Sequence, residues 1–188
     1  MNPIFSAAMD VQAFCAARNF RFCFIGGLAL QRWGEPRLTQ DVDLTVLTGL
    51  GYESRYIDEF LSVFAPRIPD ARDFALRNRV LLLVGKNAIP MDVALGAMPF
   101  EERAVNRASS FHVTESVALQ TCSAEDLIVF KAFAGRPQDW IDIEGIARRQ
   151  SQRLNVEMIW QELVPLLDLK EDEEAAPRLR QVLKPTTP

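Results

Sequence analysis

Two aspartates separated by a single residue, Asp41-Val42-Asp43, stand in a stretch of alternating polar and apolar residues. Side chains two positions apart on a β-strand point to the same face, so both carboxylates can serve one site. A third acid, Asp92, interrupts the apolar stretch 89–95, where an unpaired carboxylate is costly to bury. Since carboxylate oxygens are the ligands that Mg²⁺ prefers, Asp41, Asp43 and Asp92 are predicted to be catalytic residues that hold two Mg²⁺ ions.

A Gly-Gly pair, Gly26-Gly27, follows the apolar stretch 22–25 and precedes an expected helix at 28–33. Taken alone, such a pair indicates only an ordinary turn. Glycines before a helix also let backbone N–H groups approach phosphate oxygens, where the helix dipole favours negative charge. With the carboxylates, the pair predicts a site that binds an NTP between this turn and the metal ions.

Polar residues also precede the aspartates at alternate positions. In a strand starting at Arg37, the side chains of Arg37 and Thr39 would share the face of Asp41 and Asp43. They are therefore candidate nucleotide-binding residues, in contact with phosphate or with the metal-binding carboxylates. A structural salt bridge is the alternative.

The elements that must position these residues fall into two halves. Periodicity predicts an α+β fold, with a small mixed β-sheet and flanking helices over residues 1–120 and a C-terminal helical bundle over 121–188 that packs on this core. In the first half we expect helices at 10–19, 28–33, 53–65 and 99–107, and strands at 22–25, from Arg37 through the aspartates, at 79–84, at 89–95 and within 111–119. In the second half we expect helices at 124–134, 137–150, 156–167 and 172–183.

Composition excludes several other classes of protein. A formal net charge of −4 over 188 residues argues against a protein that coats nucleic acid. Three dispersed cysteines and a single histidine favour neither a zinc site nor a disulfide framework, and the histidine, His112, lies away from every motif. No P-loop motif is present, and neither a signal peptide nor a membrane-spanning stretch is indicated, so a cytoplasmic protein is expected.

The order of these segments resembles the DNA polymerase β nucleotidyltransferase superfamily, in which Gly-Gly or Gly-Ser is followed by Asp-x-Asp and then by a third Asp. Residues 24–30 and 37–44 carry the likeness. Within the superfamily the chain is most similar to the minimal and abortive-infection (AbiEii-like) nucleotidyltransferases of bacterial toxin–antitoxin systems, where Arg-x-Thr-x-Asp-[Ile/Val]-Asp-Leu is typical. Gly-Gly replaces the Gly-Ser of many members, so backbone contacts must replace a hydroxyl contact to phosphate.

This closer resemblance extends to residues 123–131 and 136–143, which are similar to that group's Lys and Asp-x-x-Asp segments. It implies that Lys131 lies on the inner face of its helix and reaches a triphosphate oxygen; the alternative is a surface lysine. Asp139 and Asp142 share a helix face, where one of them could orient Lys131 or bind an acceptor. Charges favoured in the first turn of a helix are the alternative.

The resemblance implies a Mg²⁺-dependent nucleotidyltransferase that moves an NMP from an NTP to a hydroxyl group and releases pyrophosphate. The acceptor would be a tRNA, a protein or a small molecule, and a partner protein of a toxin–antitoxin pair is a further expectation. One alternative is a catalytically silent module of the same fold that binds a partner protein or RNA. Another is a toxin or antitoxin that acts by stoichiometric contact.

Overall fold

The computed structural model describes residues 2–115 and 117–184. Its contacts divide the chain into two compact units. Unit 1 comprises residues 1–28 and 38–122, and unit 2 comprises residues 29–37 and 123–188. The boundary predicted from the sequence, at residue 120, assigns the segment 29–37 to the first half, whereas the contacts group it with unit 2. Residues 185–188 of the expected helical bundle lie outside the described part.

Unit 1 contains a mixed sheet, which confirms the α+β class. Its described residues form seven strands in the order β3-β4-β5-β2-β1-β7-β6. Strand β2 pairs in parallel with β5 and antiparallel with β1. The strands are β1 (Phe22–Phe24), β2 (Val42–Leu47), β3 (Ala65–Pro66), β4 (Val80–Val84), β5 (Pro90–Gly96), β6 (Ser109–Thr114) and β7 (Val117–Thr121).

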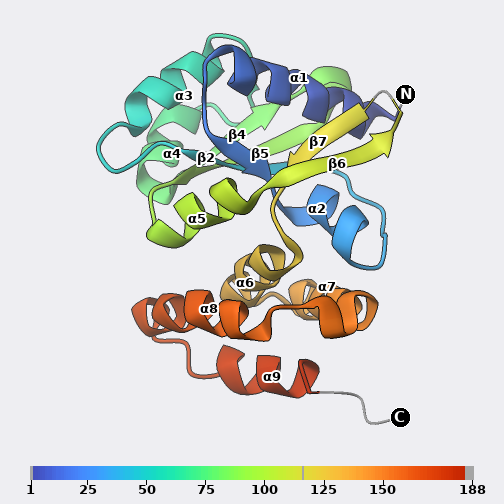
Figure 1. The fold of residues 1–188 in the computed structure, drawn as a ribbon. Coiled ribbons are helices and arrows are strands. Elements are labelled where there is room, and N and C mark those ends of the chain that lie inside the picture. Colours follow the sequence, from blue (N-terminus) through green and yellow to red (C-terminus); the bar gives the residue numbers. More distant parts are fainter. Residues whose placement is uncertain (1, 116, 185–188) are drawn as a thin grey trace. The chain divides into compact units, whose positions relative to one another are not determined.

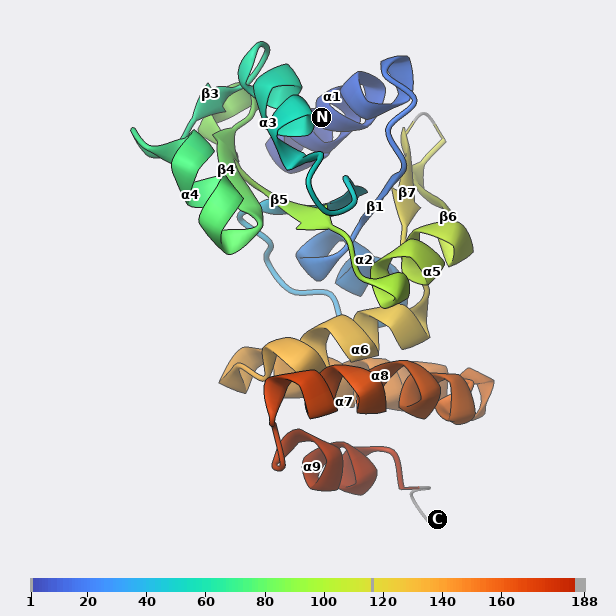
Figure 2. The same ribbon diagram turned by 90° about the vertical axis from the view of Figure 1, so that its left-hand side faces the viewer.

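Helices cover both faces of this sheet. Helices α1 and α3 lie on one face, and α5 lies on the other together with the start of α2 (Figures 1 and 2). The bounds in this unit are α1 (Pro3–Ala17), α3 (Glu53–Leu61), α4 (Ala71–Asn78), the 3₁₀ turn η1 (Lys86–Ala88) and α5 (Pro99–Arg107). Helix α2 (Gly26–Trp33) begins in unit 1 and ends in unit 2.

An aromatic cluster fills the core under α1 and α3. The Phe14 and Phe60 ring centroids lie 4.7 Å apart, and those of Phe20 and Tyr56 lie 4.5 Å apart. Phe60 is completely buried. On the same side of the sheet, alternate residues of β2 are buried as well, namely Val42, Leu44 and Val46. The opposite side chains of β2, which include Asp43, are thereby directed to the face that carries α5.

Unit 2 is helical in its described residues. It contains α6 (Ala124–Ala134), α7 (Pro137–Gln150), the 3₁₀ turn η2 (Ser151–Arg153), α8 (Val156–Lys170) and α9 (Ala175–Val182). The side chain of Ser123 accepts a hydrogen bond from the Asp126 N–H and caps α6, and Gly135 ends that helix with φ +71°. In the described chain, no helix combines the length and the apolar character that a membrane span requires.

The segment 29–37 belongs to unit 2 because α7 holds its backbone. Gln150 Nε2 donates to the Trp33 carbonyl at 2.6 Å, and Arg149 Nη1 donates to the Gly34 carbonyl at 2.5 Å. These contacts supply hydrogen-bond donors to carbonyls that α2 leaves open at its C-terminal end.

Several expected elements differ in the structure. The strand expected from Arg37 begins only at Val42, because Arg37 pairs with a side chain of unit 2 and Thr39 packs against Gly27. The helix expected at 53–65 ends at Leu61, and the sequence analysis missed β3 and α4. The β-prone stretch 111–119 forms parts of two paired strands, β6 and β7, and residue 116 between them lies outside the described part.

Replacing Phe60 by Ala should selectively destabilise unit 1. Removal of this buried ring leaves a cavity among the aromatic side chains and should cost about 3–5 kcal/mol of unfolding free energy. Both tyrosines lie in unit 1 and all three tryptophans lie in unit 2, so tyrosine and tryptophan fluorescence report on the two units separately during urea unfolding. Val63→Ala, at a side chain that is 57% exposed, should change the free energy by less than about 0.5 kcal/mol. Equal losses in the two variants would contradict this assignment of the core.

Candidate functional site

Two of the predicted carboxylates lie side by side in unit 1. Asp43 of β2 and Asp92 of β5 are direct partners across the two parallel strands, so their side chains leave the sheet on the same face. This is also the face of α5, since Thr45 Oγ1 donates to Glu101 Oε1 at 3.4 Å. The register therefore brings together an acidic pair that is far apart in the sequence.

The glycine pair lies directly against this site. Gly26 is the first residue of α2, with φ +56°, and a Cβ atom at this position would lie 2.0 Å from Asp43 Oδ2. A Cβ atom on Gly27 would lie 2.0 Å from Thr39 Oγ1. Neither position has room for a side chain, and the carboxylate of Asp43 is consequently placed beside the N-terminus of α2.

Thr39 and Asp41 lie in the irregular segment before β2. Thr39 is buried, and within the described residues its Oγ1 atom has no hydrogen-bond partner. A buried hydroxyl group of this kind can serve a ligand oxygen next to Gly27. Asp41 is partly buried and immediately precedes β2.

Arg67 is a member of the site that the sequence analysis missed. Its Nη2 atom lies 2.7 Å from Asp92 Oδ1, and the two side chains are 31% and 34% exposed. The Oδ1 atom is itself buried and, among the described atoms, has no partner of hydrogen-bond geometry, so the contact is an ion pair. No sequence signal marked Arg67, because its position depends on the pairing of the two-residue strand β3.

The acidic pair offers part of a divalent-cation site. Asp43 and Asp92 present hard oxygen ligands from neighbouring strands, and the buried Asp92 Oδ1 lacks a hydrogen bond. In the parts of the chain that the structure describes, no three His, Cys, Asp or Glu side chains form a ready metal site. Asp43 and Asp92 thus offer carboxylate ligands from two neighbouring strands, and Asp41 does not complete a ready three-carboxylate site with them among the described residues.

The other predicted residues meet in unit 2, within a buried ion network. Lys131 Nζ donates to Asp139 Oδ1 at 3.1 Å and to Asp142 Oδ2 at 2.7 Å. Arg37 donates to both oxygens of Asp142, at 3.0 and 3.1 Å, which is the salt bridge foreseen as an alternative. Lys131 is only 6% exposed and is not a surface lysine. Asp139 also accepts from the Arg136 N–H and so caps the first turn of α7.

The network controls the charge of Asp142. Burial alone would raise its pKa, but hydrogen bonds from Arg37, Lys131 and Gln138 outweigh burial and hold the pKa below the usual 3.8. A carboxyl group with a lowered pKa stabilises the folded state above its unfolded-state pKa, and this stabilisation is lost as the pH falls through the folded-state value.

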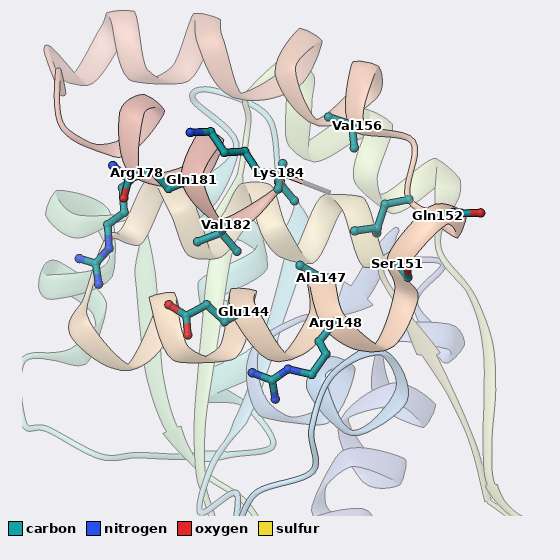
Figure 3. A pocket seen from close by; sticks show the side chains of 12 residues that line it. Glu144, Ala147, Arg148, Ser151, Gln152, Val156, Arg178, Gln181, Val182 and Lys184 are labelled. Carbon is teal, nitrogen blue, oxygen red and sulfur yellow. The ribbon is translucent and has the colours of Figure 1, made fainter. Parts of the chain in front are cut away.

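A separate pocket of about 660 Å³ lies within unit 2, between α7, η2 and α9 (Figure 3). Apolar side chains of Ala147, Val156 and Val182 line it together with polar ones such as Glu144 and Gln181. None of the residues predicted from the sequence is among its lining residues.

The Asp142 network predicts a pH-dependent stability of unit 2. Asp142→Asn should lower the unfolding free energy at pH 7 by about 2–4 kcal/mol, since Lys131 and Arg37 lose a buried partner. The loss should shrink as the pH falls below 3.8, the usual pKa of this group, and through the lower pKa that the carboxyl group has in the folded state. Tryptophan-detected urea unfolding over this range measures it, with Asp168→Asn as an exposed control. A pH-independent difference between the wild type and Asp142→Asn would contradict the prediction.

The fold is similar to that of solved nucleotidyltransferases. An antigenic nucleotidyltransferase-like protein from Paracoccidioides brasiliensis aligns over 98% of this chain and 93% of its own, with a TM-score of 0.56 and 14% identity. ANT(2'')-Ia in complex with adenylyl-2''-tobramycin aligns over 88% and 98%, with a TM-score of 0.54 and 16% identity. The lincosamide antibiotic adenylyltransferase LnuA aligns over 75% and 94%, with a TM-score of 0.51 and 9% identity. At these identities the likeness shows the fold alone.

At the level of sequence, no curated protein matches the chain. A family profile described as "Nucleotidyl transferase AbiEii toxin, Type IV TA system" matches residues 13–185. This match covers well over half of the chain and confirms the resemblance found in its motifs. The chain belongs to the AbiEii family of type IV toxin–antitoxin systems and is a nucleotidyltransferase.

Proposed function

We propose that the protein is a Mg²⁺-dependent enzyme that transfers an NMP from an NTP to an acceptor hydroxyl group and releases pyrophosphate. One observation carries the proposal: Asp43 and Asp92 are partners across β2 and β5, and Gly26 closes directly on the Asp43 carboxylate. An acidic pair beside a helix N-terminus combines ligands for a cation with donors for a phosphate group.

Within this proposal, Asp43 and Asp92 hold the cation and Asp41 is the third candidate ligand. When bound, Mg²⁺ would lower the pKa of the attacking hydroxyl group and neutralise charge on the phosphates. Gly26 and Gly27 leave room for phosphate oxygens at the backbone N–H groups that begin α2. The chain itself thus supplies mainly orientation and electrostatic stabilisation.

The contacts in unit 2 favour a positioning role for two residues first predicted to bind nucleotide. Lys131 has two carboxylate partners, and both oxygens of Asp142 accept from Arg37. A direct phosphate contact would require Lys131 or Arg37 to leave a buried partner, which is expensive. We therefore assign these residues, with Asp139 and Asp142, to maintaining the structure of unit 2.

The acceptor is proposed to be a hydroxyl group of a tRNA, a protein or a small molecule. Incubation with α-labelled NTPs, Mg²⁺ and a lysate separated into RNA, protein and small-molecule fractions tests the reaction and identifies the labelled class together. Label in one fraction supports transfer. Mg²⁺-dependent NTP binding without label in any fraction would favour the silent binding module instead.

Asp43→Asn should abolish transfer while leaving the fold intact. The change is nearly isosteric but removes one charge from the acidic pair, so label transfer should fall by about two orders of magnitude or more. The melting temperature without Mg²⁺ should hold or rise slightly, because repulsion between neighbouring carboxylates is relieved. Asp73→Asn, at an exposed position of α4, is the control and should retain activity. A lower melting temperature with retained activity per folded molecule would assign Asp43 a structural role.

Gly26→Ala should also inactivate the enzyme, by displacing the Asp43 carboxylate. Gly51→Ala is a matched control, because Gly51 also has a positive φ, of +84°, but a methyl group added there would meet no atom within 4 Å. Each variant should lose about 1 kcal/mol of unfolding free energy from backbone strain, and Gly26→Ala should lose more because its methyl group displaces Asp43. Only Gly26→Ala should in addition lose transfer, by about a hundredfold. Equal activities in the two variants would show that the contact with Asp43 does not matter.

A further inference from the structure

A row of paired residues crosses the sheet of unit 1 at the level of the acidic pair. Asp43 of β2 is opposite Asp92 of β5, and Asp92 is opposite Leu82 of β4. The backbone N–H of Arg67 donates to the Leu82 carbonyl at 3.0 Å, which extends the β3–β4 pairing by one residue. Residues directly opposite one another in paired strands point to the same face, so Arg67 starts on the face of the two aspartates.

The side chain of Arg67 reaches back along this row. Neighbouring strands lie roughly 4.8 Å apart, so Arg67 starts about 10 Å from the backbone of Asp92, a gap that an extended arginine can span. Its Nη2 atom ends 2.7 Å from Asp92 Oδ1, with Leu82 between the two backbones. The guanidinium group therefore contacts a carboxylate oxygen of the proposed cation site.

The ion pair between Arg67 and Asp92 compensates negative charge at the two neighbouring aspartates. Two carboxylates on facing positions of neighbouring strands repel one another, and a positive group on Asp92 relieves this repulsion. A divalent cation bound to the same carboxylate would meet a guanidinium group of like charge. We propose that Arg67 is the internal counter-cation of the site, and that a divalent cation competes with it for Asp92. The inference rests on the proposed function, because it takes Asp43 and Asp92 as the ligands of the cation.

Competition predicts that loss of the guanidinium group tightens cation binding. Mn²⁺ is a suitable probe, since its free concentration can be measured directly by electron paramagnetic resonance. In Arg67→Met, which keeps an unbranched side chain but no charge, the Kd for Mn²⁺ should fall about tenfold. Arg67→Lys keeps the charge and should stay near the wild-type value. Arg72→Met removes an arginine that pairs with Asp58 on the exposed surface of the same unit, and it should leave the Kd unchanged.

Thermal unfolding gives a readout that does not depend on activity. Without Mn²⁺, Arg67→Met should melt below the wild type, because Asp92 loses its ion-pair partner. Saturating Mn²⁺ should raise the melting temperature of the variant by more than that of the wild type. If Arg67→Met does not fold, Arg67→Gln is the second neutral variant and must show the same two changes. An unchanged or weaker Mn²⁺ affinity in the folded neutral variant overturns the proposal.

Mn²⁺ binding by Asp43→Asn, measured in parallel, distinguishes failure of the proposal for Arg67 from failure of the proposed function. If Asp43→Asn loses Mn²⁺ binding while Arg67→Met binds as the wild type does, only the role of Arg67 is overturned. If Asp43→Asn binds Mn²⁺ as tightly as the wild type, the acidic pair is not the cation site. The proposed function and the inference drawn from it then fall together.

Discussion

The close approach of Gly26 to the Asp43 carboxylate is the constraint on which the geometry of the site depends. Strand β1 lies between β2 and β7, and the Cys122 N–H donates to the Phe24 carbonyl at 3.0 Å, just before the turn into α2. The Ile25 N–H then donates to the Asp43 carbonyl at 3.0 Å. The backbone is thus held on β2 where it turns, and a residue without a Cβ atom must follow. The same turn that starts the helix therefore fixes the distance between its N-terminus and an acidic side chain.

Buried charge is compensated differently in the two groups of predicted residues, the network around Asp142 and the site at Asp92. Asp142 accepts four hydrogen bonds, from Arg37, Lys131 and Gln138, and its charge is fully compensated within unit 2. Asp92 Oδ1 forms an ion pair with Arg67, and this contact lacks hydrogen-bond geometry. A saturated network stabilises one arrangement and leaves little for a ligand, whereas an incomplete one can gain free energy from an added partner. This contrast supports our proposal that the ligand site lies at Asp43 and Asp92 and that Lys131 has a positioning role.

Much of the fold followed from local signals in the sequence. The helices at 99–107, 124–134 and 137–150 were predicted with the bounds that the structure shows, since Pro99, Pro137 and the pair Ser123 and Gly135 mark their ends. Alternation along β2 likewise placed Asp43 on the polar face.

Contacts between residues that are distant in the sequence were not predictable in this way. Arg37 pairs with Asp142, 105 positions away, and this contact draws it out of the strand that alternation suggested. Arg67 was missed because β3 has two residues and exists only through its pairing with β4.

The unsatisfied polar atoms supply an argument that does not depend on motifs. Among the described side chains, three buried oxygen atoms lack a hydrogen-bond partner, on Asp10, Thr39 and Asp92. Asp10 is paired through its other oxygen, which lies 2.9 Å from Lys86 Nζ. The remaining two, Thr39 and Asp92, belong to the site around Gly27 and Asp43. The Asp92 oxygen contacts Arg67 Nη2 as an ion pair, whereas the Thr39 hydroxyl group has no partner among the described atoms. Since native proteins satisfy nearly all buried polar atoms, Thr39 is the group that a bound ligand would complete. In the proposed site, Thr39 would serve a phosphate oxygen beside the glycines, and Asp92 would serve the cation beside Asp43.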